Sequence, residues 1–208
     1  MSRRIAILLT VLLASLGALL AGQVKKTEKS AGPKLEKATF AGGCFWCMQP
    51  PFDKTKGVVH TVVGYTGGKE KDPTYEQVSA GKTGHRESIE VTYDPSKVTY
   101  EQLLDVFWHS IDPTQDNGQF ADIGKQYRTA IFYYSDEQKR LAEQSKEKLA
   151  KSGKFAKPIA TEILPASQFW PTEDFHQKFY LKYPDEYKRY AVSSGRYPFL
   201  ERTWGVKH

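Results

Sequence analysis

Cysteine is scarce in this chain, with two residues in 208. Two cysteines cannot build the disulfide network of a small secreted scaffold, and they cannot supply the four thiolates of a structural zinc site. Hydrophobic residues make up 39% of the chain and charged residues 26%. This composition is typical of a soluble globular protein and excludes a disordered or collagen-like chain. The length fits one or two domains.

The chain has little net positive charge outside its N-terminal segment. The whole chain has a formal net charge of +6. Residues 1–37 contain seven Lys or Arg and two Asp or Glu, which leaves a net charge of +1 for the rest. A nearly neutral body lacks the basic surface that nucleic-acid binding requires, so we expect no nucleic-acid partner.

The N-terminus has the pattern of an export signal. Arg3 and Arg4 precede an apolar run, Ile5 to Ala21, that only three small or polar residues interrupt. A basic segment followed by an apolar run is typical of a secretory signal, and the run is slightly short of the roughly 20 residues that span a bilayer. We therefore expect residues 1–22 to be a cleaved signal peptide, with a retained N-terminal anchor as the alternative. Either would place the body in the periplasm or cell envelope.

The next segment predicts a tether and a single domain. Residues 23–37 are rich in Lys, contain Gly32-Pro33 and lack apolar periodicity, as expected of a flexible linker. No internal repeat and no later linker follow, so we expect one domain over residues 38–205.

Strand and helix patterns alternate along this domain. Strands are predicted at Ala38–Phe40, Val58–Tyr65, Ser88–Tyr93, Tyr127–Tyr134 and Lys157–Leu164. Helices are predicted from Thr99 to Pro113, from Ser135 to Gly153 and over Thr172–Lys182. This order predicts an α+β fold, which we expect to be a two-layer α/β sandwich around a mixed sheet, a ferredoxin-like plait with extensions.

The two cysteines form a C-x-x-C pair, Cys44 and Cys47, directly after two glycines. The first cysteine of such a pair, near a strand-to-helix turn, can have its thiolate stabilised by backbone N–H groups. The second is close enough to form a disulfide after a local movement. Pro50 and Pro51 require a helix here to begin late or to be distorted.

The spacing alone favours redox chemistry but leaves alternatives open. A structural disulfide is one, although so small a loop restrains the unfolded chain little. Half of a zinc site is another, although no second ligand pair follows at finger-like spacing. Covalent haem attachment would need His where Met48 stands.

A carboxylate falls in phase with apolar residues in the segment 84–93. The period of two in a strand puts Glu87 on one face with Ile89 and Val91, and Glu90 on the other. A carboxyl group in apolar surroundings has a raised pKa and can act as a general acid. The alternative is that Glu87, at the strand end, borders the core and pairs with a Lys.

Eight short motifs resemble those of the A-type peptide methionine sulfoxide reductases, in the order found in that family. They are Gly-Cys-Phe-Trp-Cys at 43–47, Gly-Tyr-Thr-Gly-Gly at 64–68, Pro-Thr-Tyr at 73–75, Gly-His-x-Glu at 84–87, Tyr-Asp-Pro at 93–95, Asp-Pro-Thr-Gln at 112–115, Asp-x-Gly-x-Gln-Tyr-Arg at 122–128 and Phe-His-Gln at 175–177. Together they cover residues 38 to about 200, nearly the whole body.

The resemblance implies a role for each matching residue. Cys44 would be the nucleophile and Glu87 the proton donor. Phe45 and Trp46 would form the pocket for the S-methyl group. The hydroxyl groups of Tyr75 and Tyr127 would join Glu87 around the sulfoxide oxygen. Asp122 would help to hold the site by hydrogen bonding. The family's Asn is replaced by Ala121 next to this carboxylate. No metal or organic cofactor is implied.

The resemblance also implies how the nucleophile is regenerated. Many family members use cysteines near the C-terminus, but this chain has none after Cys47. Cys47 would therefore condense with a sulfenic acid on Cys44, and a thioredoxin-like protein would reduce the disulfide. The family implies the S epimer of methionine sulfoxide, in proteins or free, as the substrate. We expect a monomer, with His85, His109 and His176 as structural hydrogen-bonding residues.

Two other functions stay open at this point. A general thiol–disulfide oxidoreductase would use the C-x-x-C pair without any dependence on Glu87. A non-enzymatic envelope binding module would need Cys44 for stability only.

Overall fold

The computed structural model describes residues 34–205. The predicted signal peptide or anchor, residues 1–22, lies outside the described residues, and so does most of the predicted linker. The first strand begins at Glu36, two residues before the expected start of the domain. Within residues 34–205, no helix is both long enough and apolar enough to cross a membrane.

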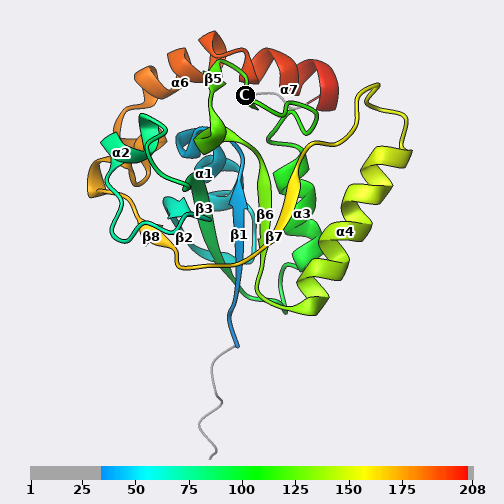
Figure 1. Cartoon of the computed structure of the whole chain (residues 1–208). Coiled ribbons are helices and arrows are strands. Elements are labelled where there is room, and N and C mark those ends of the chain that lie inside the picture. The colour runs from blue at the N-terminus through cyan, green and yellow to red at the C-terminus, as the bar shows by residue number, and fades with distance from the viewer. Residues whose placement is uncertain (1–33, 206–208) are drawn as a thin grey trace, which may run out of the picture. The chain divides into compact units, whose positions relative to one another are not determined.

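A six-stranded mixed sheet forms the centre of the described part, with the strand order β7-β6-β1-β3-β2-β8 (Figure 1). Its strands are β1 (Glu36–Ala41), β2 (Val58–Thr66), β3 (Arg86–Tyr93), β6 (Ala130–Tyr133), β7 (Glu162–Pro165) and β8 (Trp170–Pro171). Neighbouring strands are antiparallel except for the parallel pair β6–β7. Two short strands, β4 (Gly118–Gln119) and β5 (Asp122–Ile123), form a separate ladder.

Helices and the four central strands follow the connectivity of a ferredoxin-like plait. The helices are α1 (Phe45–Asp53), α2 (Tyr75–Ser79), α3 (Tyr100–Trp108), α4 (Asp136–Lys151), α5 (Phe179–Lys182), α6 (Pro184–Ser193) and α7 (Arg196–Trp204). The chain order β1-α1-β2-β3-α3-β6 combined with the spatial order β6-β1-β3-β2 is the βαββαβ arrangement. Strands β7 and β8 extend the two edges. The predicted fold class is therefore confirmed.

The core lies between the sheet and its helices. The Phe40 ring of β1 stacks on Phe52 of α1 and Phe107 of α3, with centroid distances of 5.2 and 5.1 Å. Ile89 and Val91 of β3 are fully buried beside them. Burial of such side chains stabilises the fold by roughly 1.5–3 kcal/mol each. These contacts fix α1 against β1 and β3, and this packing sets the position of the first cysteine.

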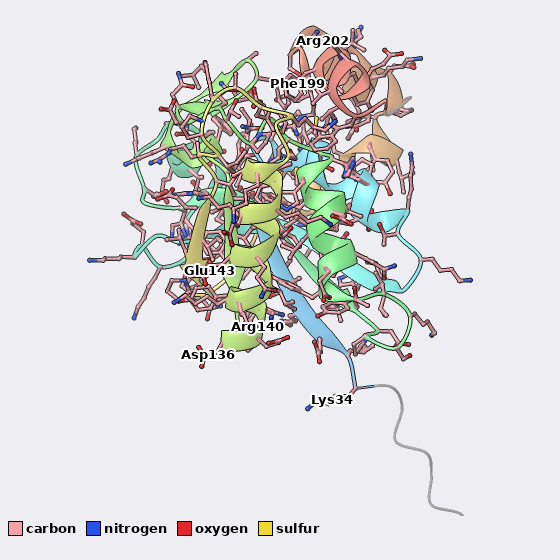
Figure 2. All side chains as sticks on the ribbon, turned by 90° about the vertical axis from the view of Figure 1, so that its right-hand side faces the viewer. Lys34, Asp136, Arg140, Glu143, Phe199 and Arg202 are labelled. Carbon is pink, nitrogen blue, oxygen red and sulfur yellow. The ribbon has the colours of Figure 1, made fainter. Side chains whose placement is uncertain are left out.

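Two predicted helix starts are confirmed by their caps. Thr99 and Gln102 form a reciprocal capping box at α3. The Ser135 hydroxyl accepts a hydrogen bond from the Gln138 N–H at α4. Figure 2 shows α4 with Arg140 labelled on its exposed face, while Ala142 of the same helix is buried. The amphipathic pattern thus orients α4 along β6 and β7.

The prediction of one helix over Thr172–Lys182 was wrong. A short 3₁₀ turn, Asp174–His176, and α5 are separated by Lys178, whose φ is +54°. Tertiary hydrogen bonds hold this break, because the Lys178 N–H donates to Gln49 and the Gln177 side chain pairs with the Val63 backbone. These contacts with α1 and β2 replace bonds that a continuous helix would make.

Other boundaries shift because of local turns. The strand expected at Tyr127–Tyr134 begins only at Ala130, since a 3₁₀ turn covers Lys125–Tyr127. Helix α3 ends at Trp108, five residues before Pro113, and β7 begins at Glu162.

Of the two alternatives that we predicted for helix α1, the late start is wrong. It starts at Phe45, directly after Cys44, and contains Pro50 and Pro51 in its interior. Because proline has no N–H group, Pro50 and Pro51 remove the helical bonds to the carbonyls of Trp46 and Cys47. In the first turn the Cys47 N–H donates to the Cys44 carbonyl at 3.1 Å, an i→i+3 bond.

A glycine pair makes the sharp turn from β1 into α1 possible. Gly43 has a φ of +78°, and a Cβ atom there would lie 2.4 Å from the Gln119 Cβ. We expect Gly43→Ala to destabilise the protein by roughly 3 kcal/mol, because the backbone strain adds to overpacking.

The matched control is Gly153→Ala. Gly153 has a similar φ of +71°, but a Cβ atom there would meet nothing within 4 Å. This variant should lose only about 1 kcal/mol. Urea unfolding of both variants measures the difference, and equal losses would show that the contact with Gln119 does not matter.

Candidate active site

The end of β1, the start of β3 and the end of β2 meet at one end of the sheet. Cys44 follows β1 and is the N-cap residue of α1. Glu87 lies near the start of β3 and is paired in register with Tyr65 near the end of β2. Because β3 runs antiparallel to both neighbours, its first residues lie beside the last residues of β1 and β2. The sheet therefore brings Glu87 to the N-terminus of α1.

Glu87 makes a direct contact with that helix. Its Oε2 accepts a hydrogen bond from the Phe45 N–H at 3.1 Å, and the residue is 2% exposed. Burial raises the pKa of Glu87 well above its ordinary value, and the neighbouring Cys44 and Asp122 raise it further. The bond from Phe45 lowers the pKa but does not reverse the shift. The raised pKa favours the neutral carboxylic acid form of Glu87. None of the ion pairs found among residues 34–205 includes Glu87, so the alternative of a Lys partner is wrong.

One small cavity collects nearly all of the predicted site residues. It has a volume of about 70 Å³. It is lined by Cys44, Phe45, Trp46, Tyr75, Glu87, Asp122, Tyr127 and Tyr190. Seven of these eight were predicted from the sequence, and they come from β1–α1, α2, β3, β5 and the 3₁₀ turn after β5. The volume suits a group of a few heavy atoms.

Two phenols share the cavity with Glu87. Burial raises the pKa of Tyr75 to about 12, and the nearby Glu87 contributes in the same direction. Burial also raises the pKa of Tyr127, with Glu87 as the next cause. Both hydroxyl groups therefore keep their protons at physiological pH and can donate hydrogen bonds to an oxygen atom in the cavity.

The aromatic wall of the cavity is held rigidly. The Trp46 ring stacks on Phe179 of α5 with a centroid distance of 3.8 Å, and its Nε1 donates to the Nδ1 atom of His176 at 3.1 Å. Burial lowers the pKa of His176, which keeps this imidazole neutral and able to accept the bond. His176 also packs on Tyr75, with ring centroids 4.3 Å apart. His176 thus positions both walls, in agreement with its predicted structural role.

Tyr190 of α6 is the cavity residue that sequence reasoning missed. Its hydroxyl donates a hydrogen bond to the Asp122 carboxylate. Burial raises the pKa of Tyr190 well above its ordinary value, and the nearby Cys44 and Asp122 act in the same direction. The signal that could have found it was Pro184 at a helix N1 position, followed by Tyr187, Tyr190 and Ala191 at helical spacing.

Cys47 lies beside Cys44 but does not line this cavity. Both cysteines are free and buried. Burial raises the pKa of Cys44 well above its ordinary value, and the hydrogen bond that the two thiols share raises it further. The same bond is the main cause that lowers the pKa of Cys47, and the Arg196 guanidinium also lowers it. The titrations of the two neighbouring thiols are therefore linked.

The other two histidines predicted to be structural, His85 and His109, have hydrogen-bond partners. His85 accepts a bond from the Gly68 N–H at 3.2 Å and contacts the Glu70 carbonyl at 2.8 Å. His109 contacts the Asp105 carbonyl at 2.7 Å, at the end of α3. Among residues 34–205, no group of three or more His, Cys, Asp or Glu side chains could hold a metal ion.

Comparisons with known proteins identify the family. The family model described as "Peptide methionine sulfoxide reductase" matches residues 36–208. This chain belongs to the peptide methionine sulfoxide reductase family.

Relatives of this peptide methionine sulfoxide reductase support the assignment. It is 53% identical over 175 residues to the peptide methionine sulfoxide reductase MsrA of Bacillus licheniformis, which covers 84% of this chain and 97% of that protein. It is 54% identical over 174 residues to MsrA of Bacillus subtilis, covering 84% and 98%. The enzyme is therefore an A-type methionine sulfoxide reductase, and it reduces methionine sulfoxide to methionine.

Solved structures of this family share the fold. Methionine sulfoxide reductase A of Corynebacterium diphtheriae matches with a TM-score of 0.66 and 37% identity, covering 73% of this chain and 76% of the other. Reduced Mxr1 of Saccharomyces cerevisiae matches with a TM-score of 0.69 and 33% identity, covering 77% and 92%.

The neutral state of Glu87 has a measurable effect on stability. Folding raises the pKa of Glu87 from its unfolded value near 4.5. At pH values between the unfolded and the folded pKa, the unfolded chain therefore binds fewer protons than the folded protein. Stability therefore falls as pH rises through that window. We expect Glu87→Gln, which keeps an acceptor for the Phe45 N–H, to be more stable than wild type at pH 7.

Urea unfolding at pH 4 and pH 7 checks this expectation. The advantage of Glu87→Gln should shrink toward zero at the lower pH, where wild-type Glu87 is protonated in both states. An advantage of the same size at both pH values would mean that Glu87 is not neutralised by folding.

Proposed function

We propose that this enzyme reduces the S epimer of methionine sulfoxide, in exported proteins and as the free amino acid, with Cys44 as nucleophile, Glu87 as general acid and Cys47 as resolving thiol. One observation carries the proposal. A buried carboxylic acid and a buried thiol line the same 70 Å³ cavity, and aromatic rings and phenols complete its wall. A general thiol–disulfide oxidoreductase has no use for the acid.

The first step joins these two groups. The Cys44 sulfur attacks the sulfoxide sulfur while Glu87 donates its proton to the oxygen, which becomes a hydroxyl group that can be transferred. The hydroxyl group then passes from the substrate sulfur to the Cys44 sulfur as the new sulfur–sulfur bond breaks, so Cys44 becomes a sulfenic acid and the substrate leaves as a thioether. The proton that the Cys44 thiol loses passes to Glu87 and replaces the proton that Glu87 gave. The step therefore neither gains nor loses protons overall.

The surrounding residues hold the substrate for this attack. Phe45 and Trp46 form an apolar surface for the S-methyl group, and the Tyr75 and Tyr127 hydroxyls donate to the sulfoxide oxygen. The Asp122 carboxylate accepts a hydrogen bond from the Tyr190 hydroxyl and holds this hydroxyl beside Cys44. A chiral sulfur with a fixed oxygen site and a fixed methyl site can fit in one configuration only, which is the basis for epimer selectivity.

The second step uses the other cysteine. The Cys47 thiol attacks the Cys44 sulfenic acid, water leaves, and a Cys44–Cys47 disulfide forms. The C-x-x-C spacing supports this role, as does the lowered pKa of Cys47, to which the neighbouring Cys44 and the Arg196 guanidinium contribute.

A thioredoxin-like dithiol protein then reduces the disulfide. Support comes from a solved complex of Saccharomyces cerevisiae Mxr1 with Trx2, which matches this chain with a TM-score of 0.50 and 26% identity over 74% of its length. We expect the enzyme to act as a monomer, since the described residues of a single chain suffice to line the sulfoxide cavity. The basic and apolar N-terminus supports export to the periplasm or cell envelope, where the enzyme would repair oxidised proteins.

The substrate proposal is tested with the two separated epimers of methionine sulfoxide. With dithiothreitol as reductant, we expect the S epimer to be converted to methionine at least about 100-fold faster than the R epimer, because only one configuration satisfies both subsites. Chromatographic measurement of methionine gives the rates. Equal rates would contradict the proposed geometry, and disulfide exchange without any sulfoxide reduction would favour a general oxidoreductase.

The resolving role is tested with Cys47→Ser in a single turnover without reductant. We expect one methionine per enzyme and a sulfenic acid that persists on Cys44, since no thiol is left to condense with it. Mass spectrometry after trapping with a sulfenic-acid reagent detects the product. Loss of the first methionine, or a sulfenic acid as short-lived as in wild type, would exclude Cys47 as the resolving thiol.

A further inference from the structure

A second cavity lies on the Cys47 side of α1. It has a volume of about 210 Å³, against about 70 Å³ for the sulfoxide cavity, and the two share no lining residue. Cys47 and Lys54 contribute from α1 and its C-terminus, Tyr187 from α6, and Arg196 and Tyr197 from α7. The two cysteines of the C-x-x-C pair therefore open onto different cavities.

The two cavities differ in charge. The sulfoxide cavity is lined by the acidic residues Glu87 and Asp122 and by no Lys or Arg. The second cavity is lined by Lys54 and Arg196 and by no Asp or Glu. An anion is therefore disfavoured at the first cavity and attracted to the second.

Arg196 lacks an anionic partner. It is 2% exposed, and none of the ion pairs found among residues 34–205 includes it. Its guanidinium donates to the carbonyls of Ser110 and Gly42 at 2.6 and 2.9 Å and lies over the Phe120 ring. A buried cation held only by neutral groups is costly unless an anion approaches it. The Cys47 sulfur, whose pKa Arg196 lowers, is the neighbouring group that can carry such a charge.

We propose that the thiolate that reduces the Cys44–Cys47 disulfide approaches through this second cavity, so that substrate and reductant reach α1 from different cavities. The inference rests on the disulfide of the proposed function. The incoming thiolate attacks the Cys47 sulfur, the Cys44–Cys47 bond breaks, and Cys44 leaves with the electron pair. A second thiol, from the same reductant or from a second molecule of a monothiol, then attacks the reductant's sulfur in the mixed disulfide, and Cys47 leaves with the electron pair. The reductant is oxidised to a disulfide, and both cysteines are reduced.

The sulfoxide cavity is a poor route for the same thiolate. At 70 Å³ it is the smaller of the two, and the stacked Trp46 ring closes one wall. A thiolate arriving there would meet the Asp122 carboxylate, which repels it. The attacking group can belong to a small dithiol or to the exposed cysteine of a protein, since both present the same thiolate.

The test uses charge reversal at the second cavity with a matched control. Lys54 is exposed and lines the cavity, whereas Lys56 is exposed two residues further along and does not. Lys54→Glu and Lys56→Glu change the net charge of the protein equally. Each variant is first oxidised with one round of excess sulfoxide, and mass spectrometry verifies the loss of two hydrogen atoms. Failure to form this disulfide would refute the proposed function, not the route of the reductant.

The oxidised proteins are then reduced with anionic 2-mercaptoethanesulfonate or cationic cysteamine. We expect Lys54→Glu to slow the anionic thiol roughly three- to fivefold relative to Lys56→Glu and to speed the cationic thiol, because the charge change lies beside its path. N-acetylmethionine methyl ester resembles the product and would occupy the sulfoxide cavity. At a saturating concentration it should leave the rate of disulfide reduction unchanged.

Two outcomes would overturn the inference. Equal rates for the two variants with both thiols would mean that the reductant does not pass Lys54. Inhibition by N-acetylmethionine methyl ester would place the route of the reductant in the sulfoxide cavity. Repeating the measurement with a thioredoxin separates the two sources of thiolate. If Lys54→Glu changes the rate with small thiols alone, the route is restricted to small reductants. If Lys54→Glu changes the rate with small thiols and with thioredoxin, the route also serves the protein reductant.

Discussion

The hydrogen bond from the Phe45 N–H to the buried Glu87 carboxyl is the constraint on which the site depends. It ties the start of β3 to the N-terminus of α1 and places an acid next to the Cys44 thiol. Burial keeps that acid neutral. An ionised carboxylate at the same place would repel a developing thiolate, whereas a neutral acid supplies the proton that sulfoxide reduction needs. The contact thus fixes the geometry, whereas burial, against the effect of this bond on the pKa, favours the protonated state.

The proposed route of the reductant separates the two half-reactions. Cys44 opens onto an acidic, aromatic cavity that suits a neutral sulfoxide, and Cys47 opens onto a larger one with Lys54 and Arg196. Because only two residues stand between the cysteines, a disulfide can connect the cavities after a local movement. Such a division lets each cavity be specialised by charge: one stabilises a proton on Glu87, and the other attracts an anionic thiolate.

Local patterns in the sequence predicted the parts of the molecule that local physics controls. The alternation that put Glu87 on the apolar face of a strand was correct, and so was the capping of α4 by Ser135. Features that depend on distant contacts were missed. Gln49 and Lys178 interrupt the helix expected after residue 172, and Tyr190 reaches the site from α6, which lies beyond every recognised motif. The neutral state of Glu87 was inferred as a possibility, and the fold was needed to establish its burial.

The central claim is that Glu87 gives a proton to the sulfoxide oxygen, and the pH dependence of the single-turnover rate tests it most directly. Methionine formation is followed without reductant in wild type and in Glu87→Gln. The account predicts that the wild-type rate falls as pH rises through the raised pKa of Glu87, and that Glu87→Gln is slower and lacks this fall. The same rate and the same pH profile in both proteins would contradict it.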